Sequence, residues 1–257
     1  MQLAIITPTS ELSRFATLGD IHLVLAQIAL GDSAYANYYI GEKKFKILDN
    51  GLFEEGRGLT PKELVGAAEL IQPDEVVLTD VLFDRKGTLE ATIECYQVFK
   101  KLYKGKPLQF MAVPQADNVE DWVQSYIELS SLPFVNTIGL SKLSIPNATK
   151  MSISKGRVAV IDKYLSKLPN WTDKQHHLLG SSNLAVQELQ HYRAKKGHIV
   201  SLRSMDTSAP YVYGSNGLLL RSDPDLIEKK LNFKALPCDS GEIVENIIDL
   251  MGLAYDC

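Results

Sequence analysis

Acidic and amide side chains follow several apolar segments of this chain, each close to the point where the segment ends. Asp49 and Asp80 come at the ends of two such segments, and Gln115 comes just after a third. Gly139 ends another, and Asp206 follows the apolar run 199–202. A carboxylate at the end of a buried strand is costly unless a ligand or partner group uses it. Because ligands bind at the carboxyl ends of parallel strands, these positions together predict one pocket lined by acids and an amide.

The chemistry of such a pocket suits a planar heterocycle such as guanine, which presents N–H donors and a carbonyl acceptor. The carboxylate of Asp80 can accept from N–H groups, and the amide of Gln115 can both donate and accept. Backbone N–H groups at Gly139 and Leu140 can bind the carbonyl oxygen. These four residues are therefore the predicted recognition wall for a base.

The remaining groups near these segment ends divide into stacking and bond-making residues. Phe53 is predicted to stack on one face of the base, and Leu179 is predicted to close the other. Asn50, between Asp49 and the glycine that follows, is assigned to the base-binding set. Asp49 and Asp206 are then left for bond-making, since two carboxylates flanking a glycosidic bond suffice for acid/base catalysis and nucleophilic substitution at a sugar carbon.

Each of these residues also has a simpler interpretation. The sequence Asp49-Asn-Gly is typical of a turn, and Asp80 or Asp206 can cap a turn. Gln115 can be a solvated loop residue, and Gly139 can simply permit a tight turn. The prediction of a site rests on the occurrence of all of them at successive segment ends.

The elements that must position these residues alternate regularly along the chain. Short apolar runs predict strands at 2–6, 45–49, 75–79, 108–113, 135–139, 177–180, 198–202 and 216–220. Amphipathic segments predict helices at 10–18, 61–71, 87–103, 118–130, 155–167, 183–195, 224–231 and 241–253. This alternation favours a parallel α/β fold, a single (β/α)8 TIM barrel domain over 1–257, with an open doubly wound sheet as the alternative. The segment 36–40 is predicted to add a hairpin strand near the barrel mouth.

Composition excludes several classes of protein. The chain has 257 residues, 45% of them hydrophobic, and a net charge of -4, so total charge does not indicate a nucleic-acid partner. Its three cysteines are far apart and form no Cys-x-x-Cys pair, which predicts a reduced, cytoplasmic protein without a disulfide framework. The five histidines show no metal-binding spacing, and no apolar run is long enough to span a membrane. We expect no metal, no cofactor and no membrane association.

Six short motifs resemble, in the same order, motifs of the tRNA-guanine transglycosylase superfamily. Leu48-Asp-Asn-Gly-Leu-Phe53 resembles the family segment Asp-Ser-Gly-Gly-Tyr/Phe, and Val77-Leu-Thr-Asp80 its second strand-end aspartate. The others are Phe110-Met-Ala-Val-Pro-Gln115, Thr137-Ile-Gly-Leu140, His177-Leu-Leu-Gly180 and Ser204-Met-Asp206. The resemblance covers about residues 45–210 and implies a (β/α)8 barrel that exchanges a guanine-type base in a polynucleotide.

Carried over by position, the resemblance implies a role for each acid. Asp206 is the expected nucleophile on C1′ of the sugar, and Asp49 the general acid/base for the departing and incoming base. Asp80 and Gln115 are expected to recognise that base. The residues after Asp206, Thr-Ser-Ala-Pro, do not match those that follow the family's nucleophile.

The chain also departs from the tRNA enzymes in the region that follows Asp206. That region holds two cysteines, Cys238 and Cys257, and no histidine. The tRNA enzymes carry a zinc subdomain there, with three cysteines and a histidine as ligands. The compact, zinc-less relatives that act on DNA, the phage 7-deazaguanine DNA transglycosylases, are therefore the better match. The expected partners are DNA, with tRNA the weaker alternative, and a free 7-deazaguanine base. A monomer is the weakly preferred state, because the tRNA relatives commonly dimerise through the missing region.

Two other functions stay open at this point. If water resolves the sugar intermediate, the protein is a DNA N-glycosidase that excises a base, normal or modified. A catalytically inactive barrel that binds a purine or a protein partner is the alternative of another class. For contact with DNA phosphates, Lys142, Arg203 and Lys44 are the candidates, since each lies near a predicted strand end or beside the Asp49 loop; a solvated basic edge is the simpler interpretation.

Overall fold

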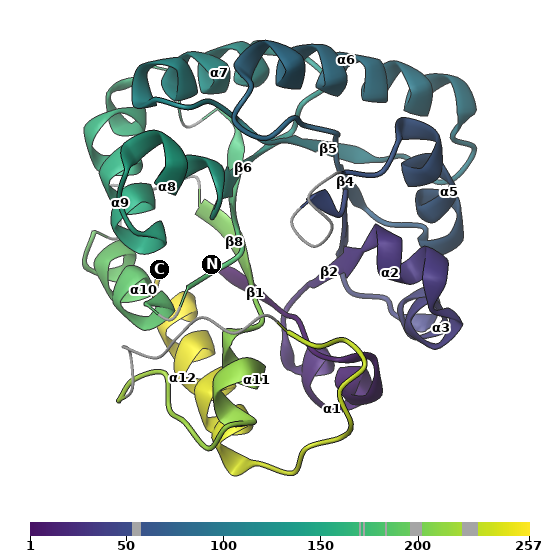
Figure 1. The fold of residues 1–257 in the computed structure, drawn as a ribbon, viewed down its shortest axis with the longest axis vertical. Coiled ribbons are helices and arrows are strands. Elements are labelled where there is room, and N and C mark those ends of the chain that lie inside the picture. Colours follow the sequence, from purple (N-terminus) through teal and green to yellow (C-terminus); the bar gives the residue numbers. More distant parts are fainter. Residues whose placement is uncertain (53–57, 170, 172, 183, 196–201, 223–230) are drawn as a thin grey trace.

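Eight parallel strands form a nearly closed barrel with helices around it (Figure 1). The computed structural model describes residues 1–52, 58–169, 171, 173–182, 184–195, 202–222 and 231–257. Each strand pairs in parallel with its neighbours in the order β1-β8-β7-β6-β5-β4-β3-β2, and an isolated parallel bridge between Ala4 and Ile21 joins the two ends. The predicted (β/α)8 barrel of the α/β class is therefore confirmed.

The strands are short, and helices or turns follow them. The strands are β1 Gln2–Ile5, β2 His22–Leu25, β3 Lys46–Asp49, β4 Glu75–Val77, β5 Gln109–Ala112, β6 Thr137–Ser141, β7 Gln175–Leu179 and β8 Leu202–Thr207. The described α-helices are α1 Leu12–Phe15, α2 Ala26–Gly31, α3 Ser33–Gly41, α5 Pro61–Ile71, α6 Arg85–Leu102, α7 Val119–Ser131, α8 Ser144–Thr149, α9 Ile153–Lys163, α10 Ala185–Ala194, α11 Ala209–Gly214 and α12 Gly241–Tyr255. Three short 3-10 helices lie at Thr9–Glu11, Ala16–Leu18 and Leu165–Lys167.

Local signals place several helices where the sequence predicts them. Helix α5 has the predicted bounds, because Thr60 accepts from the backbone N–H of Glu63 while the Glu63 side chain accepts from that of Thr60. This reciprocal capping box, followed by a proline at the first helical position, satisfies donors that a helix start otherwise leaves free. At α7 the capping residue is Asn118, which accepts from the backbone of Asp121.

Two of the strand predictions are wrong. Residues 36–40 lie in helix α3, whose start is capped by Asp32. Residues 216–220 form turns, and their backbone is bonded by one side chain of α12: Asn246 accepts from the N–H of Leu220 and donates to the carbonyl of Leu218. The missing eighth strand is β2, in the apolar segment that follows Gly19. Helix candidate 224–231 lies, except for its last residue, outside the described residues.

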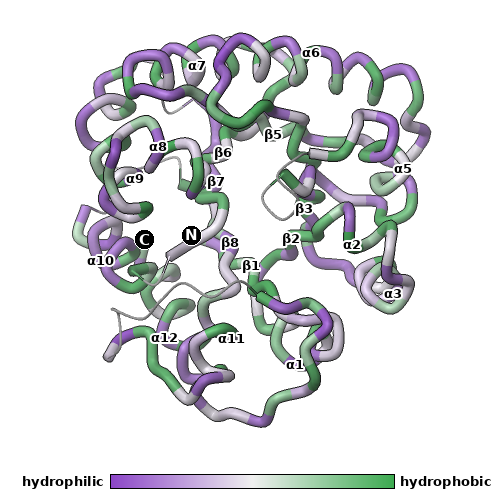
Figure 2. Tube along the Cα trace, in the orientation of Figure 1, coloured by the Kyte–Doolittle hydropathy of each residue, from purple (hydrophilic) through white to green (hydrophobic). Residues whose placement is uncertain are grey.

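Apolar side chains form one core inside the barrel and others between the barrel and its helices. The interior core includes Ala4, Leu23, Ile47, Val77 and Met111, all buried. Figure 2 shows the apolar colouring of β1 and β2 and the mixed colouring of the outer helices α6 and α7. The two ends of the chain meet, since the N-terminal ammonium group donates to the carbonyl of Ala254 in α12. Within the part of the chain described, no helix has the length and apolar character needed to cross a bilayer.

Candidate active site

A cavity of about 470 Å³ opens at the carboxyl ends of the strands. Its polar lining includes the side chains of Asp49, Asn50, Asp80, Gln115, Lys142 and Asp206, and its apolar lining includes Leu23, Leu25, Val113, Leu179 and Phe233. In a parallel barrel this face carries the ligand site in essentially every characterised enzyme. Four predicted acids and amides from four strand ends therefore share one cavity with three further predicted residues, Asn50, Lys142 and Leu179.

Asp49 ends strand β3, and a tight turn holds its carboxylate. Its Oδ2 accepts from the N–H of Gly51 at 3.0 Å. Gly51 has a φ of +79°, a backbone conformation in which other side chains are strained, so this position favours glycine. The Asn-Gly turn after Asp49 therefore orients its carboxylate. Asp49 itself stays partly exposed and lines the cavity.

Asp80 lies deeper, between two amides. Its Oδ1 accepts from Asn50 Nδ2 at 2.7 Å, and its Oδ2 accepts from Gln115 Nε2 at 2.6 Å. Burial raises the pKa of Asp80 to about 6, while the hydrogen bonds from Asn50 and Gln115 lower it by less. A buried carboxylate that faces a cavity and receives only neutral donors is a group prepared to accept further N–H groups.

The two amides that hold Asp80 are themselves oriented by the backbone. Asn50 donates its other N–H to the carbonyl of Leu78 and accepts from the N–H of Leu52, so both of its amide hydrogens are committed within the protein. Gln115 accepts at Oε1 from the N–H of Phe83, a residue with a left-handed φ of 62°. The direct base contact predicted for Asn50 is therefore corrected to a supporting role, because its donors are used to fix Asp80. Gln115 keeps one N–H for a ligand.

Binding of a base that offers N–H groups should depend on pH through Asp80. Because the pKa of Asp80 is raised to about 6, the ionised form that accepts these groups dominates only above pH 6. We expect the affinity for free guanine or 7-deazaguanine, measured by calorimetry, to rise with pH and level off above about 6, changing by about tenfold per unit below it. The matched variant Asp80→Asn should bind weakly without this dependence; a flat profile in the wild-type protein would contradict the role.

The raised pKa of Asp80 also affects the stability of the fold, and this effect changes with pH in the opposite direction to ligand binding. The folded protein holds the Asp80 proton more tightly than the unfolded chain, whose pKa is near the ordinary 3.8. The free energy of unfolding contributed by this group therefore falls as pH rises from about 4 to about 6. A group that binds ligand best where it stabilises the fold least is typical of a functional site.

Asp206 lies at the end of strand β8 on the other side of the cavity, and two donors hold one of its oxygens. Oδ1 accepts from the backbone N–H of Gly180 at 2.7 Å and lies 3.0 Å from Nε2 of His177. Among the described residues none donates a hydrogen bond to Oδ2, and the side chain is 6% exposed. One oxygen is thus anchored, and the other is left for a ligand in the cavity.

The loop that anchors Asp206 depends on a buried ion pair. Gly180 has a φ of +69°, and its carbonyl accepts from Arg157 Nη1 at 2.6 Å. The guanidinium of Arg157 also pairs with Glu188 at 2.7 Å, and both side chains are fully buried. Because breaking such a pair is costly, Arg157 fixes the Gly180 peptide whose N–H points at Asp206.

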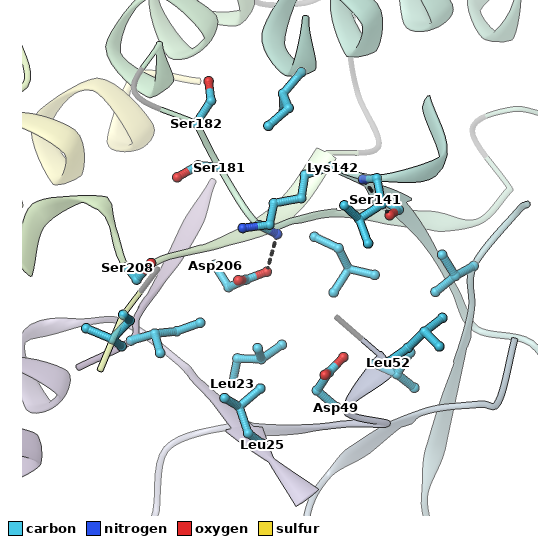
Figure 3. A pocket seen from close by; sticks show the side chains of 18 of the residues that line it. Leu23, Leu25, Asp49, Leu52, Ser141, Lys142, Ser181, Ser182, Asp206 and Ser208 are labelled. Atoms are coloured by element: carbon cyan, nitrogen blue, oxygen red, sulfur yellow. Dashed lines mark hydrogen bonds between the residues drawn. The ribbon is translucent and has the colours of Figure 1, made fainter. Parts of the chain in front are cut away.

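Figure 3 shows Asp49 and Asp206 on different walls of the same cavity, with both carboxylates directed into it. The dashed hydrogen bond in this view ends on Asp206, and Lys142 extends along the same wall. The Lys142 side chain covers Gly180, where a Cβ atom would collide with the Lys142 Cδ. A cation beside the cavity mouth suits a phosphate. Ser181, Ser182 and Ser208 form the rim beyond Asp206 (Figure 3).

Some of the predicted base contacts are placed differently. Gly139 and Leu140 lie inside strand β6, which runs on to Ser141, and neither lines the cavity. Gly139 faces the barrel interior, where a Cβ atom would collide with Leu179, and its backbone belongs to the sheet. The prediction of two backbone donors at Gly139 and Leu140 is therefore wrong. Leu179 does line the cavity, and Phe53 lies outside the described residues.

Two of the predicted phosphate contacts lie at the opposite end of the barrel. Arg203 pairs with Glu75 at 2.6 Å at the amino ends of strands β8 and β4, and it also contacts Phe45. Lys44 precedes strand β3 and donates to the carbonyls of Thr17 and Gly19, both at 2.6 Å. Both predictions are wrong, because a residue that begins a parallel strand lies on the face away from the carboxyl ends. Lys142 is the one of the three beside the cavity.

A residue that the sequence analysis did not assign, His177, contacts Asp206 directly. It is fully buried in strand β7, two residues before Leu179. Side chains two apart on a strand share a face, so the assignment of Leu179 to the pocket was the available signal for His177. No such signal exists for Arg157, whose helix α9 lies outside the barrel and whose contact with Gly180 arises only in the folded chain.

The described residues hold no group of three or more His, Cys, Asp or Glu side chains that could bind a metal ion. The cavity contains three aspartates in different settings. Asp80 lies between two amides, Asp49 accepts from the N–H of a glycine turn, and Asp206 contacts a histidine and a peptide N–H. No model of a known protein family and no curated protein sequence matches this chain.

Proposed function

We propose that this protein is a DNA base-modifying transglycosylase that exchanges guanine for a 7-deazaguanine derivative through a covalent intermediate between Asp206 and deoxyribose. The observation that carries the proposal is the division of labour among three aspartates of one cavity. Asp80 is buried between amides, where it suits an N–H-bearing ring edge, while Asp49 and Asp206 reach the cavity from different walls. The choice of DNA and of a 7-deazaguanine base rests on the sequence resemblance.

In the first half of the reaction the sugar is transferred to the protein. Oδ2 of Asp206 attacks C1′ and forms a C–O bond, and the C1′–N9 bond breaks with its electron pair going to the base. Asp49, as the acid, gives its proton to the departing base. His177 and the Gly180 N–H hold Oδ1 throughout, so the attacking oxygen needs no reorientation.

The second half reverses these bonds with another base. Asp49, now the carboxylate, takes the proton from the incoming base, whose nitrogen attacks C1′. The C1′–O bond breaks, and its electron pair returns to the Asp206 carboxylate. One base enters and one leaves, so the exchange is balanced without an oxidant or a nucleotide cofactor. Lys142, beside Asp206 at the cavity mouth, is placed to contact a backbone phosphate.

Incubation with duplex or single-stranded DNA and a labelled 7-deazaguanine base tests this function. We expect label to enter the DNA with release of one guanine per label, and tRNA in a parallel reaction to take up little. Abasic sites without label would identify the hydrolytic N-glycosidase instead, since water then replaces the base in the second half. Neither product, with retained binding of free base, would support an inactive purine-binding barrel.

A further inference from the structure

A continuous row of polar side chains crosses the interior of the barrel from its amino-terminal end to the cavity. Glu75 accepts from Arg203 Nη2 at 2.6 Å, and Arg203 Nε donates to Ser204 Oγ at 3.1 Å. Ser204 Oγ lies 2.7 Å from His177 Nδ1, and His177 Nε2 lies 3.0 Å from Asp206 Oδ1. We call Glu75, Arg203, Ser204 and His177 the polar column. Its last member touches the proposed nucleophile.

A β-bulge in strand β8 builds this column. His176 of β7 pairs with Leu202, but the next residue, His177, pairs with Ser204, so Arg203 is an extra residue on β8. The bulge lets Arg203 reach Glu75 while Ser204 and Asp206 face the interior. Side chains alternate between the two faces of a strand, so without the extra residue those on one side of the bulge would point to the opposite face.

Two of the bonds in the column have a direction set by chemistry. A guanidinium only donates, so Ser204 Oγ accepts from Arg203. A carboxylate only accepts, so the hydrogen between His177 and Asp206 lies on Nε2. The hydroxyl hydrogen of Ser204 can then point at Nδ1, and the bonds at both ring nitrogens suit the tautomer with its hydrogen on Nε2.

Burying the polar side chains of the column costs free energy, which is unusual in a barrel interior without a function. Glu75, Ser204 and His177 are fully buried, and Arg203 is 14% exposed. Barrel interiors are usually filled by branched apolar side chains, and burying polar groups costs free energy even when they are paired. The column ends at a carboxylate that faces the cavity of about 470 Å³ at the carboxyl ends of the strands.

We propose that His177 is a positioning residue for Asp206, with the Ser204 hydroxyl supporting its Nε2–H tautomer; this rests on the proposed function. Its Nε2–H and the Gly180 N–H both hold Oδ1 and so direct Oδ2 at C1′. The same two donors stabilise the negative charge that returns to Asp206 when the sugar ester breaks. His177 itself transfers no proton in either half of the reaction.

Two substitutions of His177 separate this role from simple packing. In His177→Gln the side-chain amide can still donate to Asp206 and accept from Ser204, whereas His177→Leu fills the space without either bond. We expect His177→Leu to slow formation of the covalent intermediate in single turnover by about 10- to 100-fold, and His177→Gln to recover most of that rate. Affinity for the free base should be unchanged in both, because Asp80 and Gln115 are untouched.

Heteronuclear NMR of the His177 ring nitrogens gives a second measurement that needs no turnover. The wild-type protein should show the hydrogen on Nε2, and Ser204→Ala should shift the ring towards a mixture of tautomers. A hydrogen on Nδ1 in the wild type, or equal rates for His177→Leu and the wild type, would overturn the proposal. An enzyme with neither exchange nor excision activity but with the Nε2–H tautomer would reject the proposed function while retaining the column's effect on Asp206.

Discussion

Asp206→Asn is expected to lower the rate of base exchange by at least about a thousandfold, because removal of a nucleophile that forms the covalent intermediate has among the largest effects on kcat. The amide oxygen can still accept from the Gly180 N–H and from His177 at Oδ1, so the loop should stay in place. The amide nitrogen at the other position is a poor nucleophile. The loss should therefore appear in chemistry rather than in folding.

Mass spectrometry of the protein after quenching with DNA measures this directly. The wild-type chain should carry a sugar-linked DNA adduct at Asp206, and the variant should carry none, while both melt at similar temperatures. Asp249→Asn is the matched control, since Asp249 lies on helix α12 in an exposed pair with Arg221. Exchange by Asp206→Asn within about tenfold of the wild type would remove Asp206 from the nucleophile role.

Asp49→Asn is expected to lower kcat by about 10²- to 10⁴-fold, the usual contribution of a general acid. Asparagine can still accept from the N–H of Gly51, so the turn that follows β3 should survive. What is lost is the proton that the departing guanine requires. The defect should therefore depend on the base that leaves.

DNA containing 7-methylguanine provides the test, because this cationic base departs as a neutral molecule without a proton. With such DNA, single-turnover rates of Asp49→Asn and the wild-type protein should be nearly equal, whereas ordinary guanine should show the full loss. Equal losses on both substrates would show that Asp49 positions the substrate without donating a proton. Comparison with Asp206→Asn, which should fail on both, separates the two acids.

The barrel and most of its elements were predictable from local patterns. Helix α5 begins at its proline because Thr60 and Glu63 cap each other, which is a property of a few neighbouring residues. The run 216–220 has the composition of a strand, but its backbone is hydrogen-bonded to the side chain of Asn246, far along the chain. No local pattern predicts that contact. Strand β2 was hidden because its segment, His22–Leu25, is buried on both faces and runs directly into helix α2.

For the site, the sequence by itself determined which acids stand at strand ends, since Asp49 and Asp80 follow apolar runs with parallel-strand character. Only the tertiary structure decided which of the basic residues share that face: Lys142 does, but Arg203 lies at the opposite end, because a bulge and strand polarity place it there. Likewise, the contact between His177 and Asp206 depends on the register of two paired strands. Register is set by the packing of the whole barrel, so residues 29 apart in sequence meet only once it has closed.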